Sequence, residues 1–489
     1  MCRPLLGRPC CLSLLTFLFV VVVIFDILST CSGSYPDVDN PLPSISSGDK
    51  EVDGQHYKYS SEFSSMLRTR LEKMASSPLA SPEIFNVDDY GAMGDGEDDS
   101  EAFKETWKDA CSSTNAIFLV PCDRVYHLKP ITFTGPCNSP LLFKIEGTIK
   151  ASPHISDYEK DRRHWIIFQN LLGLRVEGKG IINGNGRKWW LNSCKVNKTL
   201  PCKEAPTAVT FFQCTNLRVE GLRFRNAQQM HLSFQKCNNV KALNLWIHSP
   251  GNSPNTDGIH VTGTQFIVIK NCLIMTGDDC LSIVSGSKNV RAKGITCGPG
   301  HGISIGSLGA GKTEAEVSNV VVDTAKFSGT TNGVRIKTWQ GGKGYAQNII
   351  FQNIVMDNVT NPIIIDQNYC DQKEPCTQQV NTSITEFSTT QNFNIYKKKY
   401  LLNILSNTIQ ADAVEVSNVV YQNIRGTSAS EVAVKFNCSK SIPCQGILLQ
   451  DINLVHKGKN DDKSAQAEAS CKNVKLKNRG RVSPLCGGR

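Results

Sequence analysis

Short apolar runs separated by polar turn residues repeat along the middle of the chain. Each run is rich in Val, Ile, Leu and Phe and is interrupted by Gly, Asn or Ser, as expected for a short strand followed by a turn. The runs start at Asn, or at a residue in its place, namely at Asn216, Asn239, Gln265, Asn289, Asn319 and Asn348. Their spacing of 23 to 30 residues matches one coil of a solenoid. The pattern therefore predicts an all-β fold, a right-handed single-stranded parallel β-helix.

The composition fits such a solenoid, with 38 Gly, few aromatic residues and 40% hydrophobic residues to fill a long core. A globular sandwich of 489 residues would normally split into several domains, whereas a solenoid grows by adding coils. We therefore expect one β-helical domain over residues 83–489. Residues 34–82 are rich in Ser, Asp and Pro, and we expect a low-complexity linker or pro-segment there.

The N-terminus has the pattern of a secretory signal. Arg3 and Arg8 precede an uncharged, largely apolar stretch over residues 11–25, and small residues follow at 29–33. The apolar stretch is shorter than a comfortable membrane span. We expect residues 1–33 to be a cleaved signal peptide and the protein to be secreted, with an uncleaved signal anchor as the alternative.

The cysteines support an oxidising compartment, because removing residues 1–33 leaves 16 of the 20, an even number. Four pairs could close small loops, although other pairings stay open: Cys370 with Cys376, Cys438 with Cys444, Cys471 with Cys486, and Cys280 with Cys297. The chain has no two-pair CxxC pattern of the kind that binds zinc. Sequons mark four candidate glycosylation sites at Asn197, Asn358, Asn381 and Asn437.

The formal net charge is +9, and the Lys and Arg residues are dispersed rather than grouped in blocks. For a secreted chain of this kind, an acidic polymer outside the cell is a better partner than nucleic acid. We expect a monomer, with no nucleic-acid partner and no stable membrane association after signal cleavage.

Three carboxylates and an imidazole recur at a spacing close to one coil. The separation from Asp257 to Asp278 is 21 residues, and that from Asp279 to His301 is 22. Groups that recur once per coil lie about 4.8 Å apart. Carboxyl groups this close share a proton, and one pKa rises, which provides the acid and the base of glycoside hydrolysis. Asp278 and Asp279 are adjacent, so both face one side only if the backbone bends, which Gly277 permits.

Arg335 and Lys337 alternate around Ile336, so both cations should project from one face while Ile336 enters the core. Arg can bind a carboxylate through two hydrogen bonds, and Lys binds it as a point charge. A cation pair beside the carboxylates therefore indicates recognition of an anionic sugar.

These clusters lie in four ordered motifs, NTDGIHV (255–261), GDDCLSI (277–283), GPGHGISIGSLG (298–309) and RIKTWQG (335–341). Three more stretches carry the same resemblance: FNVDDYGAMGDGEDDSEAF (85–103), INGNGRKWW (182–190) and IDQNYC (365–370). Over nearly everything after residue 83, the chain resembles the polygalacturonases of glycoside hydrolase family 28 in their plant form.

The resemblance implies inverting hydrolysis of α-1,4-linked galacturonic acid in pectin, without a metal or other cofactor. Asp278 would be the general acid, and Asp257 with Asp279 would hold and activate the water. His301 would support the protonation state of the acid.

The resemblance also implies a set of substrate-binding residues. Arg335 and Lys337 would bind substrate carboxylates, Tyr369 would line the cleft, and Asn255 would shape the same subsite. Whether the enzyme cuts within the polymer or from its end depends on loops that these motifs do not describe.

Residues 381–410 depart from the pattern, since this stretch has no Gly, Pro or Cys and interrupts the repeat. The resemblance would join the sequence before residue 381 almost directly to the sequence after 410. We hypothesise a retained intron or a faulty gene model, with a real surface insertion as the alternative.

Three rival functions share this scaffold. A rhamnogalacturonan hydrolase is the nearest, but the RIK cations favour consecutive uronic acids. A pectate lyase would use calcium and an Arg base, and the GDD and GHG motifs argue against it. A catalytically impaired pectin-binding wall protein is the alternative from a different class.

Overall fold

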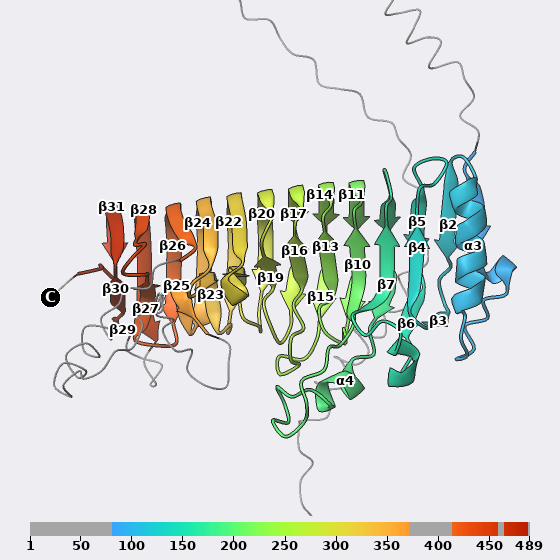
Figure 1. Cartoon of the computed structure of the whole chain (residues 1–489), viewed down its shortest axis with the longest axis horizontal. Coiled ribbons are helices and arrows are strands. Elements are labelled where there is room, and N and C mark those ends of the chain that lie inside the picture. The colour runs from blue at the N-terminus through green and yellow to red at the C-terminus, as the bar shows by residue number, and fades with distance from the viewer. Residues whose placement is uncertain (1–80, 371–412, 458–463, 488–489) are drawn as a thin grey trace, which may run out of the picture. The chain divides into compact units, whose positions relative to one another are not determined.

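The computed structural model describes residues 81–370, 413–457 and 464–487 (Figure 1). They form a right-handed single-stranded parallel β-helix, so the predicted all-β fold is confirmed. Successive coils stack so that strands far apart in sequence lie side by side. The expected signal peptide (1–33), nearly all of the expected linker (34–82) and the atypical segment (381–410) lie outside the described residues.

Within the described residues, one sheet has eleven strands, and we call it the eleven-stranded sheet. In chain order its strands are β4 (Ile131–Thr134), β7 (His164–Gln169), β10 (Thr207–Phe212), β13 (Leu232–Gln235), β16 (Ile259–Thr262), β19 (Leu281–Ile283), β21 (Ile303–Leu308), β23 (Asn332–Trp339), β25 (Asn361–Tyr369), β27 (Val432–Asn437) and β30 (Glu468–Lys472). Neighbouring strands pair in parallel, each with the strand of the next coil.

The remaining described strands form a twenty-stranded sheet on the other sides of the solenoid. Its strands are β1 (Glu83–Asn86), β2 (Ala116–Val120), β3 (Val125–Leu128), β5 (Leu142–Ile145), β6 (Thr148–Ala151), β8 (Arg175–Glu177), β9 (Ile181–Asn183), β11 (Thr215–Glu220), β12 (Arg223–Arg225), β14 (Asn238–Leu243), β15 (Trp246–His248), β17 (Gln265–Lys270), β18 (Leu273–Met275), β20 (Lys288–Cys297), β22 (Glu314–Ser328), β24 (Lys343–Val359), β26 (Glu415–Ser428), β28 (Cys444–Lys457), β29 (Ser464–Gln466) and β31 (Val474–Ser483). Its pairings are parallel except that of β28 with β29.

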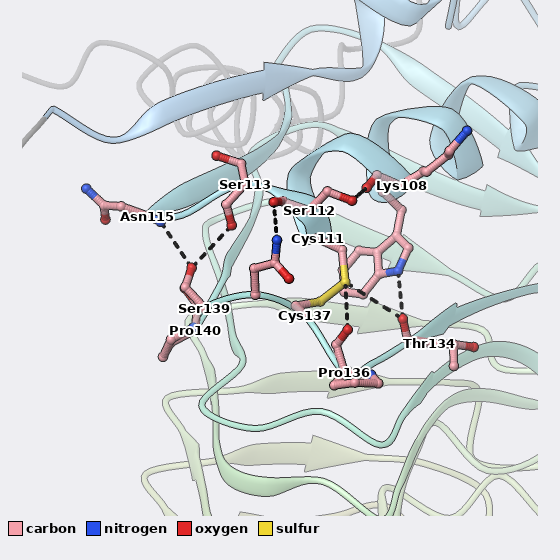
Figure 2. Close-up of a disulfide and its surroundings, with 12 residues drawn as sticks. Lys108, Cys111, Ser112, Ser113, Asn115, Thr134, Pro136, Cys137, Ser139 and Pro140 are labelled. Carbon is pink, nitrogen blue, oxygen red and sulfur yellow. Dashed lines mark hydrogen bonds between the residues drawn. A yellow bond between two sulfur atoms is a disulfide. The ribbon is translucent and has the colours of Figure 1, made fainter.

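Helix α3 (Ser100–Ser112) covers the first coils of the solenoid (Figure 1). Its apolar face buries Phe103 and Trp107 against the aromatic start of the core. Trp107 Nε1 donates to Thr134 O at 3.2 Å, and a Cys111–Cys137 disulfide joins the end of the helix to the segment after β4 (Figure 2). The cap therefore closes the apolar end that a first coil would otherwise expose.

The other described helices are short: α4 (Arg187–Leu191) and the 3₁₀ helices η1 (Val87–Tyr90), η2 (Ile155–Tyr158) and η3 (Ala310–Lys312). Among the residues that the structure describes, none of the helices has the length and apolar character needed to cross a membrane.

The core is built from inward side chains stacked in rows at the spacing of the strands. Phe133, Phe168, Phe211 and Phe234 pair in register on successive strands, with ring centroids 5.0, 5.1 and 5.5 Å apart. The same row continues with the fully buried side chains of Val261, Ile283, Ile305, Ile336 and Ile365. The alternating pattern of the sequence therefore adds one apolar side chain per coil to this row of the core.

Stacked Asn side chains hold one corner of the coils. They have left-handed φ values of +54° to +58°, which Asn tolerates better than most residues, at Asn216, Asn239, Asn289, Asn319, Asn348 and Asn418. Asn239 Nδ2, for example, donates to Asn216 Oδ1 at 2.7 Å. On the coil between those of Asn239 and Asn289, the corner residue is Phe266 rather than the expected Gln265. Gln265 pairs in register with Asn238, so Phe266 takes the position that follows, where the preceding coil has Asn239.

Three of the four candidate disulfides are present: Cys280–Cys297, Cys438–Cys444 and Cys471–Cys486. The fourth, Cys370 with Cys376, involves a residue outside the described part of the chain. A further bond joins Cys194 to Cys202.

The candidate glycosylation sites differ in exposure. Asn197 and Asn358 are exposed, Asn381 lies outside the described residues, and Asn437 is half-buried with its amide donating to Asp366 Oδ1 at 3.2 Å. Glycosylation stays a prediction, and Asn197 and Asn358 are the more accessible positions.

Candidate active site

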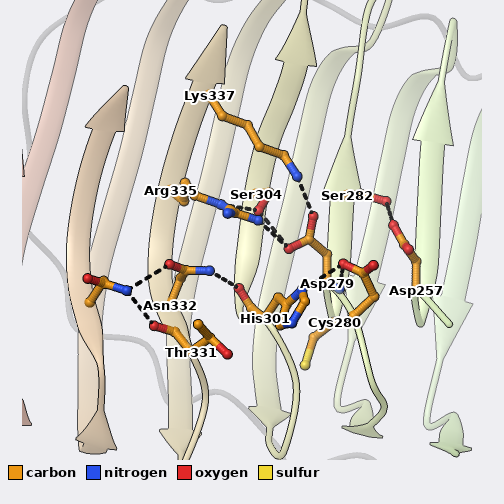
Figure 3. Close-up of polar contacts among 12 residues, drawn as sticks. Asp257, Asp279, Cys280, Ser282, His301, Ser304, Thr331, Asn332, Arg335 and Lys337 are labelled. Atoms are coloured by element: carbon orange, nitrogen blue, oxygen red, sulfur yellow. Dashed lines mark hydrogen bonds and ion pairs between the residues drawn. The ribbon is translucent and has the colours of Figure 1, made fainter. Parts of the chain in front are cut away.

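All eight residues predicted for the site line a single cleft of about 470 Å³ on the outer face of the eleven-stranded sheet. The three groups at coil spacing, Asp257, Asp279 and His301, each stand two residues before the first residue of a strand, namely before β16, β19 and β21. The parallel register therefore stacks them on adjacent coils, as Figure 3 shows.

Asp279 is enclosed by donors, with its side chain only 2% exposed. Its Oδ1 accepts from Ser304 Oγ and from Arg335 Nη2, both at 2.9 Å, and its Oδ2 accepts from Lys337 Nζ at 3.0 Å (Figure 3). Arg335 Nε also donates to Ser304 Oγ at 3.1 Å. The buried carboxylate is thus stabilised as an anion by two cations and a hydroxyl.

Asp278 lines the same cleft, and three groups hold its carboxylate. Its Oδ1 accepts from the Asp279 backbone N–H at 2.8 Å and lies 2.9 Å from His301 Nδ1, while its Oδ2 accepts from Asn255 Nδ2 at 3.3 Å. Burial raises the pKa of Asp278, but the hydrogen bond and charge of His301 and the charge of Lys337 outweigh it, so the pKa lies below its usual value. The same hydrogen bond raises the pKa of His301 above its usual value, against the effect of burial.

The pKa of Asp257 is shifted in the opposite direction to that of Asp278. Burial, together with the charges of Asp278 and Asp279, raises the pKa of Asp257 well above its usual value. A hydrogen bond from Ser282 Oγ to Asp257 Oδ2, at 2.7 Å, and the charge of Lys337 oppose this rise. Two carboxyl groups on adjacent coils therefore have pKa values displaced in opposite directions, which is the expected electrostatics of an acid/base pair.

Glycines allow the backbone of these turns to pack closely. A Cβ on Gly277 would lie 2.0 Å from Ser253 O, so the turn before Asp278 requires glycine there. Gly302 has φ +83°, and a Cβ there would lie 2.1 Å from Asn332 O. The bend expected at Gly277 is present, and both adjacent Asp side chains line the cleft.

Tyr369 closes one side of the site. Its ring centroid lies 5.4 Å from Lys337 Nζ, in a cation–π arrangement, and 5.4 Å from the ring of Trp339, which pairs with Tyr369 in register. Ile336 is fully buried between Arg335 and Lys337, so the predicted alternation of the RIK motif is confirmed.

The polar residues of the site that were not selected from the sequence include His260, Ser282 and Ser304. Each follows a selected residue by three positions, because His260 follows Asp257, Ser282 follows Asp279 and Ser304 follows His301. The three lie in one row with Arg335, in register on successive strands. This shared offset was a signal in the sequence that would have identified them.

A second hollow of about 240 Å³ adjoins the cleft at Pro254 and Asn255. Trp189 and Trp190 of the INGNGRKWW motif line it, and Arg162 lies with its guanidinium 5.3 Å from the Trp189 ring centroid. The hollowed surface therefore continues beyond the eight predicted residues along the solenoid.

The site also has the composition of a weak cation site, since ligand atoms of Asp278, Asp279 and His301 lie within 4.8 Å of one another. Both Asp279 oxygens, however, already accept hydrogen bonds from positively charged side chains. The prediction of a reaction without a metal stays a prediction.

The site combines two carboxyl groups, whose pKa values are shifted in opposite directions, with two cations on the outer face of a parallel β-helix. Such a site suits acid/base cleavage of an anionic polysaccharide. The sequence matches the family described as Glycosyl hydrolases family 28 over residues 111–395 and 395–481. The chain belongs to this family and is a glycoside hydrolase. The two matched stretches meet at residue 395, within the atypical segment 381–410.

Similar proteins cover most of the chain. Polygalacturonase QRT2 of Arabidopsis thaliana is 53% identical over 95% of this chain and 98% of its own length. Polygalacturonase-2 of Solanum lycopersicum is 47% identical over 96% of this chain and 95% of its own. The solved structure of the polygalacturonase from Erwinia carotovora ssp. carotovora shares the fold at 21% identity, with a TM-score of 0.61 over 82% of this chain and 98% of its own.

Proposed function

We propose that the protein is a polygalacturonase that hydrolyses α-1,4 linkages between galacturonic acid residues of pectin. The observation that carries this proposal is the placement of Asp278 and Asp257, with pKa values displaced in opposite directions, beside Arg335 and Lys337. The names of the similar plant proteins support the same substrate. Secretion to the cell wall, a contribution to wall remodelling and a monomeric state complete the proposal.

The reaction is a direct displacement by water. Asp278 protonates the glycosidic oxygen as it leaves, and a water on the opposite side of the sugar attacks the anomeric carbon, with inversion. Both Asp279 oxygens already accept from cations, and Asp279 orients the water. Asp257 takes the proton of that water.

Arg335 and Lys337 recognise the substrate with the donors that Asp279 leaves unused. A guanidinium has five N–H groups and an ammonium has three. In the structure, Arg335 donates one N–H to Asp279 and one to Ser304, and Lys337 donates one to Asp279. Enough donors therefore remain for a uronate carboxylate to bind both cations without displacing Asp279.

Substrate binding also raises the pKa of the group that must act as the acid. Without substrate the raised pKa belongs to Asp257, whereas the acid must be Asp278. The charge of Lys337 contributes to the low pKa of Asp278. A uronate bound at Lys337 offsets that charge, so the pKa of Asp278 rises when the acid is required.

The test is the release of reducing ends from polygalacturonic acid, with rhamnogalacturonan and a neutral glycan as comparison substrates and with EDTA present. Release from polygalacturonic acid alone, unaffected by EDTA and without an unsaturated product, supports the proposal. Unsaturated products would indicate a lyase, and release from rhamnogalacturonan alone would identify the rival hydrolase. The viscosity of the solution, followed in parallel, separates internal cutting from cutting at the chain end.

A further inference from the structure

Asp257 belongs to a chain of hydrogen bonds that reaches beyond the carboxyl groups. Ser282 Oγ donates to Asp257 Oδ2 at 2.7 Å, and the same Oγ lies 2.8 Å from His260 Nδ1. His260 on β16 and Ser282 on β19 are partners in the parallel register, so adjacent coils hold them together. None of the roles proposed above uses His260 or Ser282.

The directions of these hydrogen bonds determine where the imidazole carries its proton. A Ser hydroxyl has one hydrogen. When Ser282 donates that hydrogen to Asp257, its oxygen can only accept from its other neighbour, so His260 Nδ1 must carry an N–H. A neutral imidazole in this tautomer has its lone pair on Nε2.

The surroundings of His260 keep the imidazole neutral in most conditions. Burial is the largest effect and lowers the pKa of His260 to about 4, with Lys337 lowering it further and Asp279 raising it. On the preceding coil, the row position beside His260 is the uncharged and buried Ser233. Above pH 4, His260 therefore acts as a fixed N–H donor rather than as a charge.

We propose that His260 is a positioning residue whose Nδ1–H directs the Ser282 hydroxyl toward Asp257 Oδ2. The other oxygen of Asp257 accepts no hydrogen bond from the part of the chain that the structure describes, and it is then the one that takes the proton of the attacking water. This inference rests on the proposed hydrolytic function, because it assigns the base role to Asp257.

The consequence is a change in the pH at which Asp257 becomes available as a base. Burial, Asp278 and Asp279 raise its pKa, and the Ser282 hydroxyl and Lys337 oppose them. Without the N–H of His260, the hydroxyl is free to rotate away, and Asp257 stays protonated to higher pH. The acid limb of the activity profile then moves to higher pH by about one unit. Losing a hydrogen bond to a charged group changes the pKa of that group by about one or two units.

The experiment measures kcat/KM against pH on polygalacturonic acid for the wild type, His260→Leu, Ser282→Ala and the double variant. Each single change is expected to move the acid limb upward by about one pH unit. The double variant is expected to move it no further, because both changes remove the same hydrogen bond. His260→Asn carries an amide N–H near the position of Nδ1 and is expected to keep the wild-type limb. His154→Asn, at an exposed His, is the matched control.

Three results would overturn the inference: equal loss of activity at every pH, additive shifts in the double variant, or a His260→Asn profile like that of His260→Leu. Thermal unfolding of each variant identifies any that does not fold, and the variants that do fold decide the outcome.

A second measurement keeps this inference separate from the proposed function. The infrared band of the protonated Asp257 carboxyl, assigned by its loss in Asp257→Asn, is titrated in the wild type and in His260→Leu. A higher midpoint in His260→Leu supports the hydrogen-bond chain even if the wild type cleaves no polygalacturonic acid. An unchanged midpoint refutes the chain even if the wild type is active.

Discussion

Asp279 is the most enclosed charge of the site, and its contacts connect the residues proposed to bind substrate with those proposed to catalyse its cleavage. Its carboxylate accepts from Arg335, Lys337 and Ser304, and its side chain is 2% exposed. An anion in that position would be costly without these partners. The same two cations are the groups proposed to meet the substrate carboxylate, so a change at either one affects both functions.

Replacing Lys337 with Gln is expected to raise KM for polygalacturonic acid by roughly 10- to 100-fold, the effect of losing a hydrogen bond to a charged group. The turnover number should fall as well, because Asp279 loses one of its donors. Steady-state kinetics on polygalacturonic acid measure both quantities, with the exposed Lys326→Gln as control. A lower turnover number at unchanged KM would mean that Lys337 acts on Asp279 alone.

The Asp278–His301 pair should stabilise the fold within a limited pH window. The pKa of Asp278 is lowered, so its contribution is present above its usual value of 3.8 and is lost as pH falls through the lowered pKa. The pKa of His301 is raised, so its contribution is present below its usual value of 6.5 and is lost as pH rises through the raised pKa. The pair is therefore fully formed near pH 5.

His301→Gln is accordingly expected to lower the melting temperature more at pH 5 than at pH 9. Differential scanning calorimetry at the two pH values measures the difference, and the exposed His154→Gln is expected to show none. An equal loss at both pH values would show that the ion pair does not contribute.

At the scale of elements, the turns that enter successive strands supply the carboxyl groups and His301, whereas β23 supplies Arg335 and Lys337 and β25 supplies Tyr369. The alternating runs predicted those strands, because alternate side chains of each strand must reach the core. The charged residues could be selected for the same reason, since Asp257, Asp279 and His301 recur at coil spacing.

Two features of the site, its serine residues and the order of its carboxyl pKa values, were not predicted, for physical reasons. Ser282 and Ser304 have no charge to distinguish them from ordinary strand residues, and their shared three-residue offset gains a meaning only through the parallel register that brings them to Asp257 and Asp279. The pKa order of Asp257 and Asp278 depends on burial and on the His301 contact, which spacing alone does not determine.

The Cys280–Cys297 disulfide connects the turn that carries Asp279 to the end of β20. Removing it with a double Cys→Ala change is expected to reduce the free energy of unfolding by about 3 kcal/mol, the value for a loop of similar length. It should also lower the turnover number, because Cys280 directly follows Asp279.

The Cys471–Cys486 bond closes a loop of similar size, with a sequence separation of 15 against 17, and none of its residues lines the cleft. It is the matched control, and its removal should reduce stability without changing the turnover number. Chemical denaturation and steady-state kinetics compare the two variants. Equal effects on turnover would show that the position of the first bond beside Asp279 is unimportant.

At the scale of the whole molecule, the solenoid continues in register on both sides of residues 371–412. Strand β24 pairs with β26, and β25 pairs with β27, through parallel contacts that span the described residues before and after this stretch. The coils on both sides therefore contact one another directly.

Deleting residues 381–410 is therefore expected to leave the fold intact, because residues 371–380 and 411–412 remain to connect the coils. The deletion variant should keep or exceed the activity of the full chain on polygalacturonic acid, with an unchanged circular dichroism spectrum. Sequencing of transcripts tests the gene-model hypothesis directly. Loss of folding in the variant, or peptides from residues 381–410 in secreted protein, would favour a real insertion.

The central claim is that a water molecule, activated by Asp257 and Asp279, displaces a leaving group protonated by Asp278. The most direct test is the configuration of the first sugar released from a galacturonate oligomer, followed by proton NMR before the anomers equilibrate. The account predicts inversion, with the β-anomer formed first from an α linkage. The α-anomer as the first product would contradict it, because a carboxylate nucleophile would then be required.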